Sequence, residues 1–272
     1  MEYKGKVTMS NKLGFIGCGK MAKAIIKGVL SGNNNIEITA STSSDISAQK
    51  AQEELGIKVI CDNKFVADFA DVIFIATKPN QVETVLNEIK DIIDEKKLIV
   101  SVAAGVSTKK IQNVLGNIPV IRVMPNTPAL VNEGISAIAK GAIATDEDVQ
   151  KVENILKCVG KVISVEENQI DVVTAISGSG PAFFYQIFED MAQAGVKLGL
   201  DYDKSLLLAV QTALGSAKMT LNREKPLTNL IASVATKGGC TEVGINTMKI
   251  LNSSDLFNEV IQKTTNKAHE LG

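Results

Sequence analysis

Alternation between short apolar runs and helical patterns constrains the fold of this chain more than any other feature of its sequence. Apolar runs of strand length recur through residues 1–166, and segments with helical periodicity lie between many of them. Parallel strands need long crossover connections, usually helices, so the alternation predicts a parallel sheet with helices on both faces. The predicted strands are residues 13–16, 36–40, 58–60, 72–76, 98–102, 120–123, 135–139 and 162–165.

A change of pattern near Glu167 divides the chain into two predicted domains. Residues 167–272 read almost entirely as helix, so we predict an α/β domain over residues 1–166 and an all-helical domain over residues 167–272. Residues 203–221, DKSLLLAVQTALGSAKMTL, are apolar or small nearly all round, which is typical of a helix buried on every side. We therefore predict a large subunit interface there. A monomer whose first domain covers this helix is the alternative.

A glycine-rich turn follows the first predicted strand and opens a helix. It reads Gly17-x-Gly19-x-x-Ala22, which is the spacing of a dinucleotide-binding turn. Gly17 would form the tight turn, Gly19 would let a pyrophosphate approach the backbone, and Ala22 would pack the helix on the strand. The helix N-terminus would direct its amides at the phosphates. This context predicts a Rossmann domain that binds a dinucleotide, and a purely structural turn is the alternative.

The second predicted strand ends in a hydroxyl-rich turn, ASTSS at residues 40–44. NAD sites usually carry a carboxylate at this strand end, where it holds the ribose 2′-hydroxyl. Glu37 has the sequence spacing of that carboxylate, but it lies at the start of the strand, so we do not expect it to bind the ribose. The turn has no carboxylate to repel a 2′-phosphate and no arginine to bind one. It therefore predicts a modest preference for NADPH, with NADH as the alternative. The same serines would also suit the cap of a helix beginning at Asp45.

Later strand ends border the same crevice. In FIATKP a strand ends at Ala76 and a helix begins through Pro79, a favoured first helical residue. In VSVAAGV another strand ends at Val102 and is followed by small residues. Such residues suit a flat nicotinamide ribose lying close to the backbone, although they are equally common in ordinary packing.

The sequence lacks the side chains of ordinary acid–base catalysis. His269 is the one histidine and lies near the C-terminus, and the four cysteines are far apart, so no zinc-type ligand set is expected. A nicotinamide supplies its own hydride, so the protein need only orient cofactor and substrate. The pattern favours a substrate that is already electrophilic, such as a protonated imine, over an alcohol.

Two further glycine stretches interrupt the helical part. In SVATKGGCTEVGINTM, a glycine pair at residues 238–239 precedes a helix predicted to begin near Thr241. The amides of that helix N-terminus would accept a substrate carboxylate, and an ordinary N-cap is the alternative. ISGSGPAFF, residues 176–184, breaks a long helical pattern. We interpret it as a kink where Gly178 and Gly180 leave room for ligands. A simple boundary between two helices, with Pro181 opening the second, is the alternative.

Charge and composition exclude several partners. The net charge is −1 and no basic stripe is visible, so no nucleic acid or anionic membrane surface is expected as a partner. No run of 18 apolar residues predicts a transmembrane helix, and residues 1–12 lack the apolar centre of a signal peptide. With its cysteines as free thiols, the chain is expected in the cytoplasm.

Several segments together resemble one enzyme family. They run from GFIGCGKMAKAI through ATKP, VSVAAGV, RVMPNTPALVNEG and ISGSGPAFF to TKGGCTEVG, and so cover nearly the whole chain. In this order they resemble pyrroline-5-carboxylate reductase, and MPNTPA and SGSGPA are far more specific than the glycine-rich turn. The resemblance implies a Rossmann domain and a helical domain that interlocks with a second subunit in a homodimer, with five dimers forming a decamer. It also implies hydride transfer from NAD(P)H to the C=N carbon of 1-pyrroline-5-carboxylate, which gives L-proline in the last step of proline biosynthesis.

The resemblance implies the site residues as well. The cofactor would contact Ile16, Gly17, Cys18, Gly19, Lys20, Met21, Ser41, Ser43, Asn63, Ala76, Thr77, Lys78, Pro79, Val102, Ala103 and Ala104. The substrate would contact Ser177, Gly178, Ser233, Gly239, Cys240 and Thr241, with its carboxylate on the amides after the glycine pair. The hydroxyl of Thr241 would be the catalytic group.

Departures from the family pattern leave alternatives open. Lys237 and Cys240 stand in a loop that typically reads S-P-G-G-T-T, and Lys20 stands where a neutral amide is common. Another cyclic imine acid, such as the six-membered analogue, is therefore an alternative substrate. A β-hydroxyacid dehydrogenase would need a catalytic lysine on the long helix, but the first lysine after residues 176–184 is Lys197. A non-catalytic NADP-binding regulator is the remaining alternative.

Overall fold

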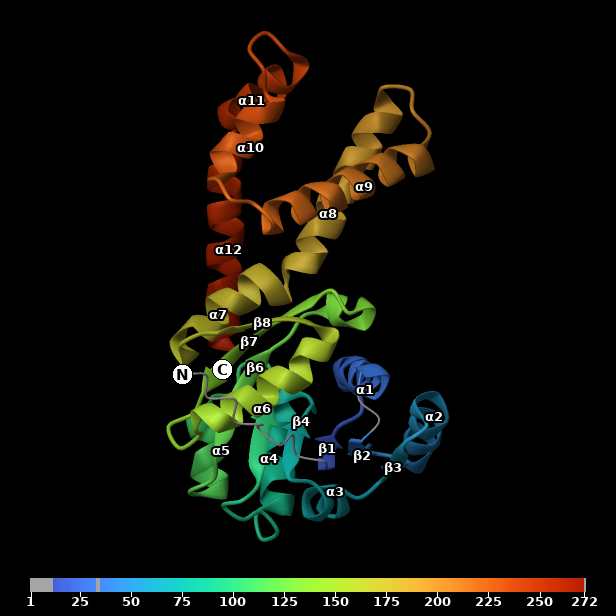
Figure 1. Cartoon of the computed structure of the whole chain (residues 1–272), viewed down its shortest axis with the longest axis vertical. Coiled ribbons are helices and arrows are strands. Elements are labelled where there is room, and N and C mark those ends of the chain that lie inside the picture. The colour runs from blue at the N-terminus through green and yellow to red at the C-terminus, as the bar shows by residue number, and fades with distance from the viewer. Residues whose placement is uncertain (1–11, 33–34, 272) are drawn as a thin grey trace, which may run out of the picture. The chain divides into compact units, whose positions relative to one another are not determined.

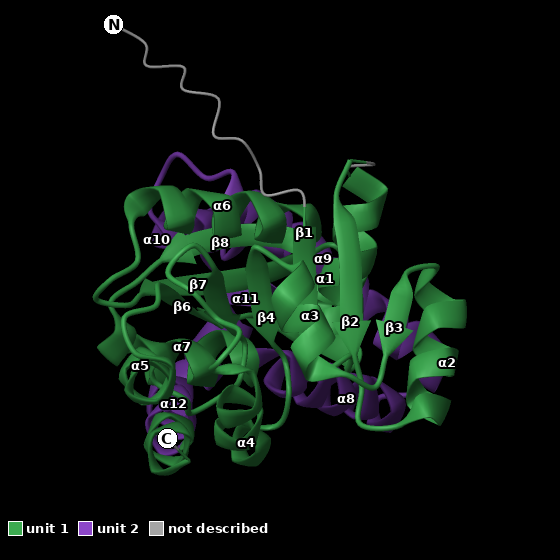
Figure 2. Ribbon diagram, turned by 90° about the horizontal axis from the view of Figure 1, so that it is seen from below, with its two compact units in different colours: residues 1–179, 264–272 green, residues 180–263 purple. Residues whose placement is uncertain are grey.

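The computed structural model describes residues 12–32 and 35–271 (Figure 1). The chain divides into two compact units, residues 1–179 with 264–272 and residues 180–263 (Figure 2). The predicted lack of a signal peptide concerns residues 1–12, nearly all of which lie outside the described residues. Within the described part of the chain, no helix is both long enough and apolar enough to cross a lipid bilayer.

The first unit is built on an eight-stranded sheet with the order β3-β2-β1-β4-β5-β6-β7-β8. Its strands are β1 (Lys12–Ile16), β2 (Glu37–Ser41), β3 (Lys58–Ile60), β4 (Val72–Ile75), β5 (Leu98–Ser101), β6 (Val120–Met124), β7 (Gly134–Lys140) and β8 (Gly160–Ser164). Each corresponds to one of the predicted strands. Neighbouring strands are parallel except β6 and β7, which are antiparallel. The reversal follows from a connection that holds only a five-residue 3₁₀ turn, η1 (Thr127–Val131), which is too short for a parallel crossover.

Helices cover both faces of the sheet, as the alternation predicts. Their bounds are α1 (Lys20–Gly32), α2 (Asp45–Leu55), α3 (Asn63–Phe69), α4 (Pro79–Ile89), α5 (Thr108–Leu115), α6 (Asp146–Leu156) and α7 (Ile170–Val173), with short turns η2 (Lys157–Val159) and η3 (Glu167–Gln169). Apolar side chains of α1, α2 and α6 pack in one core cluster, and those of α3, α4 and α5 pack in another. Successive strand residues supply opposite clusters, as Phe74 and Ile75 do.

An aromatic pair fixes the two strands that lead into the glycine-rich turn. Phe15 of β1 and Phe74 of β4 are register partners, and their fully buried rings stack with centroids 4.6 Å apart. Offset-stacked aromatic pairs of this kind stabilise a core beyond their buried area by about 0.5–1.5 kcal/mol. The carboxyl ends of β1 and β4, which carry Gly17 and Ala76, are thereby held side by side.

The interruption at residues 176–184 is a break in regular helix. After α7 the chain forms a π-helical segment, η4 (Thr174–Gly178), and Ser179 N–H donates to the Thr174 carbonyl at 2.8 Å. A new helix, α8, then begins at Gly180 with Pro181 in its first turn, where a missing N–H costs nothing. The break agrees with the predicted boundary between two helices, with Pro181 at the start of the second, and the two compact units divide at this point. That Gly178 and Gly180 leave room for ligands stays a prediction. π-Helical turns are frequent at functional sites.

All the regular secondary structure described in the second unit is helical. It contains α8 (Gly180–Lys197), α9 (Tyr202–Leu221), α10 (Leu227–Val234), α11 (Cys240–Ile250) and most of α12 (Ser253–Glu270), whose last residues belong to the first unit. The segment 203–221, predicted as one apolar helix, is α9. Within a single chain, most of its large apolar side chains are exposed: Leu207, Leu208, Val210, Leu214, Met219 and Leu221. An apolar surface of this kind marks an interaction site.

Candidate functional site

A polar cavity of about 360 Å³ lies at the carboxyl ends of β1, β2 and β4. It is lined by Gly17, Thr42, Ser43, Asn63, Thr77, Gln81, Thr84, Val85 and Glu88. In open α/β sheets, ligands bind in the crevice outside the carboxyl ends of the strands, near the point where the strand order reverses. Here the order reverses between β1 and β4, so the cavity lies where this rule places a nucleotide.

Gly17 occupies a position that no other residue would fit. Its φ is +93°, and a Cβ there would lie 2.7 Å from the carbonyl oxygen of Ala76 and 2.9 Å from the backbone nitrogen of Thr77. Its own N–H donates to the Ser41 carbonyl at 3.1 Å. The predicted role of Gly17 in the tight turn agrees with this geometry. Ala22, the third residue of the fingerprint, is 1% exposed in the core.

Gly19 differs from Gly17 because nothing in the protein crowds it. A Cβ at Gly19 would have no heavy atom within 4 Å, and α1 begins at the next residue, Lys20. The first-turn amides of a helix have no partner within the helix, and their dipole favours an anion. The fold itself therefore does not require a glycine at position 19. The open space beside its backbone fits a pyrophosphate at this turn.

The buried hydroxyl of Thr77 also fits a ligand. Among the described residues, its Oγ1 atom is one of three buried side-chain polar atoms without a hydrogen-bond partner. Buried polar atoms are nearly always paired, so an unpaired hydroxyl at the wall of a polar cavity calls for an explanation. A bound ribose or phosphate oxygen would supply the missing partner.

A chain of hydrogen bonds links the end of β2 to α4 at this cavity. The hydroxyl of Ser41 donates to Oδ1 of Asn63 at 2.6 Å, and Nδ2 of Asn63 donates to Oε2 of Glu88 at 2.8 Å. Ser44 is not part of it, because its hydroxyl caps α2 by accepting the Ser47 N–H. The serines at residues 40–44 thus serve two purposes, one structural and one at the cavity.

The remaining predicted cofactor residues lie at the ends of neighbouring strands and at the starts of α1 and α4. Ala76 N–H donates to the Ile16 carbonyl at 2.8 Å, and Val102 N–H donates to the Ile75 carbonyl at 3.1 Å. These bonds set the ends of β1, β4 and β5 side by side. The residues include buried Ile16 and Ala103, half-buried Cys18, Met21, Ala76 and Val102, and exposed Lys20, Lys78, Pro79 and Ala104. Burial raises the pKa of the Cys18 thiol, which keeps it an unreactive part of the turn at neutral pH.

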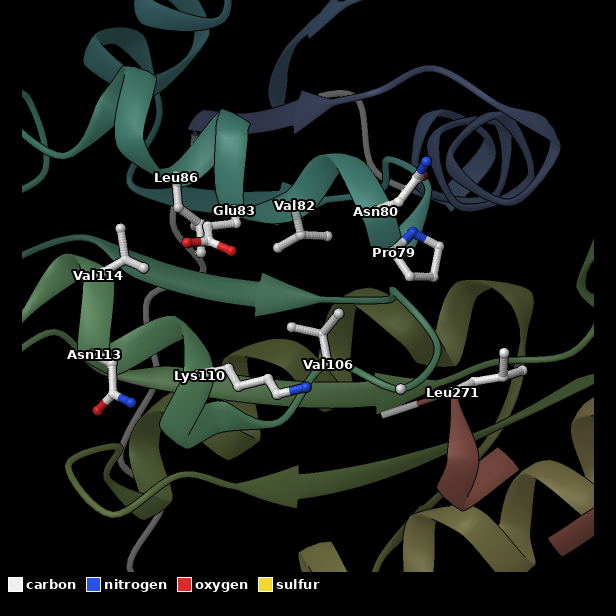
Figure 3. A pocket seen from close by; sticks show the side chains of 11 residues that line it. Pro79, Asn80, Val82, Glu83, Leu86, Val106, Lys110, Asn113, Val114 and Leu271 are labelled. Carbon is white, nitrogen blue, oxygen red and sulfur yellow. The ribbon is translucent and has the colours of Figure 1, made fainter. Parts of the chain in front are cut away.

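A second cavity, of about 570 Å³, lies between α4 and α5 (Figure 3). Figure 3 shows Val82 of α4 opposite Val106, with Leu86 further along the same helix on the side of Val114. Of the predicted cofactor residues only Pro79 lines this cavity. Neither the glycine-rich turn nor the serines at residues 40–44 line this second cavity. The polar cavity is therefore the candidate nucleotide site.

Residues predicted to touch the substrate occur in both units. In the first unit, the Ser177 hydroxyl is buried without a partner, and a Cβ at Gly178 would meet the Met124 sulfur at an ordinary 3.6 Å. In the second unit, α11 begins at Cys240 with Gly239 as its N-cap, close to the predicted start. Gly239 has no side chain to cap the helix, so the first-turn amides receive no hydrogen bond from it.

The loop before α11 is held by one of its own carboxylates. Gly238, with φ +78°, donates its N–H to Oε2 of Glu242 at 2.7 Å. Thr241 is half buried and Cys240 is exposed, while the Ser233 hydroxyl donates to the Leu230 carbonyl at 2.7 Å. The Glu242 carboxylate thus accepts from the amide before Gly239, whereas the sequence predicts an anion at the amides after it.

Comparison with known proteins decides the family. The family model for pyrroline-5-carboxylate reductase dimerisation matches residues 167–271, and that for NADP oxidoreductase, coenzyme F420-dependent, matches residues 12–105. The pyrroline-5-carboxylate reductase of Methanosarcina acetivorans is 36% identical over 266 residues, which cover 97% of this chain and 98% of the relative. The chain belongs to the pyrroline-5-carboxylate reductase family. The resemblance stated from the sequence motifs is thereby confirmed.

Solved structures of this family have the same fold. A pyrroline-5-carboxylate reductase from Coxiella burnetii has a TM-score of 0.92 at 35% identity, covering 97% of this chain and 99% of that one. The Plasmodium falciparum pyrroline carboxylate reductase, solved with NADP bound, has a TM-score of 0.85 at 28% identity over 98% of this chain and 100% of that one. The match of the dimerisation model supports self-association through the helical part of the chain.

We did not predict from the sequence that α4 would line the polar cavity of this family member. Gln81, Thr84 and Glu88 line it from one helix face. Their spacing of three and then four residues was the available signal, because residues so spaced lie on one side of a helix. The turn at residues 40–44 indeed holds no carboxylate, but α4 brings one to the same cavity.

Proposed function

We propose that this chain reduces the C=N bond of 1-pyrroline-5-carboxylate to give L-proline, with NADPH as the hydride donor. The observation that carries the proposal is the polar cavity at the carboxyl ends of β1, β2 and β4, where Gly19 leaves the backbone open and the Thr77 hydroxyl lacks a partner. Both features fit a dinucleotide. When bound, the nicotinamide supplies the hydride, so the protein needs no metal or covalent nucleophile for this reduction.

The chain's own residues would bind and orient the cofactor. The amides at the start of α1, after the turn at Gly17 and Gly19, would hold the pyrophosphate. Ser41, Ser43 and Asn63 would face the adenosine ribose. The proposed contacts along the rest of the site are Ile16, Cys18, Lys20, Met21, Ala76, Thr77, Lys78, Pro79, Val102, Ala103 and Ala104. Thr77 would gain the hydrogen bond that its buried hydroxyl lacks.

The substrate would be oriented by groups from two segments. Its carboxylate would accept hydrogen bonds from the first-turn amides of α11, at Cys240 and Thr241 after Gly239, with Ser233 nearby in sequence. The Thr241 hydroxyl is the proposed catalytic group, because it can donate to or accept from the imine ring beside those amides. Ser177, with its unpaired buried hydroxyl, and Gly178 are the proposed contacts from the π-helical segment.

The helical part would form an interlocked homodimer, and five dimers would form a decamer. The exposed leucines of α9 support this, because a monomer would leave a long apolar helix in water. A domain boundary between residues 166 and 167 is part of the proposal, since β8 ends at Ser164 and the dimerisation model begins at residue 167. A cytoplasmic location also stays a prediction.

The decisive experiment follows cofactor absorbance at 340 nm with purified protein, 1-pyrroline-5-carboxylate, and NADPH or NADH in parallel. Turnover that is faster with NADPH supports the proposal as stated. The six-membered cyclic imine acid is run beside it, because Lys237 and Cys240 depart from the family's loop. Faster turnover of that analogue would replace the proposed substrate. NADPH binding without turnover of either imine would favour a regulator.

A further inference from the structure

One charged side chain lines the polar cavity. Among the described residues that line the cavity, Glu88 alone carries a charge, and no lysine or arginine joins it. The other polar groups there are hydroxyls and amides from Thr42, Ser43, Asn63 and Thr77. A site for a 2′-phosphate usually offers a cation, whereas a site for a 2′-hydroxyl offers a carboxylate. The carboxylate of Glu88 therefore matches a site for a 2′-hydroxyl.

Hydrogen bonds hold that carboxylate in a defined place. Asn63 accepts from the buried hydroxyl of Ser41 through Oδ1, at 2.6 Å, and donates through Nδ2 to Oε2 of Glu88, at 2.8 Å. The Ser41 hydroxyl fixes which end of the amide faces the cavity, because a hydroxyl donor pairs with the amide oxygen. Asn63 therefore presents its N–H₂ toward Glu88 and toward any group bound beside it.

We propose that Glu88 sets the ribose preference of the cofactor site, and this inference rests on the proposed function. Its carboxylate accepts a hydrogen bond from the 2′-hydroxyl of NAD(H), the task that a carboxylate at the end of the second strand performs in other Rossmann sites. The same carboxylate weakens the binding of NADP(H). It repels the 2′-phosphate and occupies the Asn63 N–H that the phosphate would use. Glu88 thus lowers the ratio of NADPH to NADH affinity.

The test compares Glu88→Gln with Glu83→Gln. Both glutamates are exposed residues of α4, and both substitutions remove one negative charge, but Glu83 lines the cavity between α4 and α5 instead. Dissociation constants for NADP⁺ and NAD⁺ are measured by isothermal titration calorimetry on the full chain, with thermal unfolding as the check of folding. Adenosine 2′,5′-bisphosphate and AMP are titrated as well, because they report on the ribose end alone.

Glu88→Gln should tighten NADP⁺ and adenosine 2′,5′-bisphosphate about fivefold, the effect of one like charge about 4 Å away in water-like surroundings. NAD⁺ and AMP should bind no more tightly, and the gain should shrink in high salt. Glu83→Gln should leave the ratio of affinities unchanged. Equal shifts for both variants, or a gain for NAD⁺ equal to that for NADP⁺, would overturn the role of Glu88 while leaving the proposed function intact. Failure of the parent protein to bind either dinucleotide would overturn both.

Discussion

Thr108 donates two hydrogen bonds to the carboxylate of Glu167, from its backbone N–H at 2.7 Å and from its hydroxyl at 2.6 Å. The same carboxylate lies 3.7 Å from a guanidinium nitrogen of Arg122, a side chain only 7% exposed on β6. Arg122 also lies 3.7 Å from Asp171, and Asp171 lies 3.2 Å from Nδ1 of His269. This polar cluster ties the start and the end of the helical part to the sheet.

Replacing Glu167 with alanine should lower the free energy of unfolding by about 2 kcal/mol, because the buried guanidinium of Arg122 and the N–H of Thr108 would lose a charged acceptor. Urea denaturation measures the change. Glu95→Ala, at an exposed residue between α4 and β5, is the control for loss of one charge. A double-mutant cycle with Thr108→Val should show coupling, and additive effects would contradict the importance of the pair.

Alanine substitutions at Gly19 and Gly17 should affect nucleotide binding and protein stability differently. Gly19→Ala should unfold at the same temperature as the parent, because nothing lies within 4 Å of the new methyl group. It should nevertheless bind NADP⁺ at least tenfold more weakly, since that methyl group occupies the space proposed for the pyrophosphate; tenfold corresponds to about 1.4 kcal/mol. Gly17→Ala should lose stability as well, because its φ is +93° and the Ala76 carbonyl lies 2.7 Å from the new atom. Unchanged NADP⁺ binding by Gly19→Ala in calorimetry would contradict the proposed site.

The strands could be predicted from the sequence because parallel strands buried on both faces are continuous apolar runs with clear ends. The reversal of β7 could not, since strand direction depends on the length of a connection whose 3₁₀ turn leaves no periodic signal. Glu167 and Asp171 contact Arg122 of the sheet and belong to the first compact unit, which ends at Ser179; no local sequence pattern encodes these tertiary contacts. The spacing of Gln81, Thr84 and Glu88 on α4 was a local signal for one wall of the cavity. The hydrogen bond between Glu88 and Asn63 had no such signal, because the two residues are far apart in sequence and come together only when α3 and α4 lie side by side.

The π-helical segment offers a test of function against folding. Gly178→Ala should change the free energy of unfolding by less than about 1 kcal/mol, because the new methyl group would make only ordinary contacts at 3.6 Å or more. It should lower kcat/KM for 1-pyrroline-5-carboxylate about 100-fold if substrate and cofactor approach the backbone there, as small misplacements in an active site cost that much. Gly32→Ala, whose methyl group also meets only an ordinary contact, is the control. Matching losses of stability and activity in Gly178→Ala would indicate a purely structural break.

The capping box of α6 should make stability depend on acid pH. Partial burial acts to raise the pKa of Asp148, but hydrogen bonds from the Thr145 N–H and hydroxyl and from Lys151 outweigh it and hold the pKa below its usual value. A carboxyl whose pKa is lowered by folding stabilises the protein above its unfolded-state pKa, and this stabilisation is lost as the pH falls through the folded value. Asp148→Asn should therefore cost about 1 kcal/mol at neutral pH, the typical worth of a cap.

The cost of Asp148→Asn should shrink as the pH falls below about 4, where the parent carboxyl also becomes protonated. Thermal unfolding of both proteins across acid and neutral pH measures the difference. Asp91→Asn, at an exposed position after α4, controls for the loss of one charge. A difference between Asp148→Asn and the parent that stays constant down to the lowest pH would contradict the assignment.

The exposed face of α9 predicts how the assembly can be broken. Leu207 is 66% exposed within a single chain, on a helix that is apolar or small nearly all round. If that face is buried between subunits, Leu207→Asp would place a charge without a partner in the interface, which costs several kcal/mol. Light scattering after size exclusion should then show a smaller species whose circular dichroism keeps its helical signal. Ile46→Asp, at an equally exposed residue of α2 in the first unit, should leave the mass unchanged. An unaltered assembly of Leu207→Asp would show that Leu207 lies outside the subunit interface and would contradict this prediction.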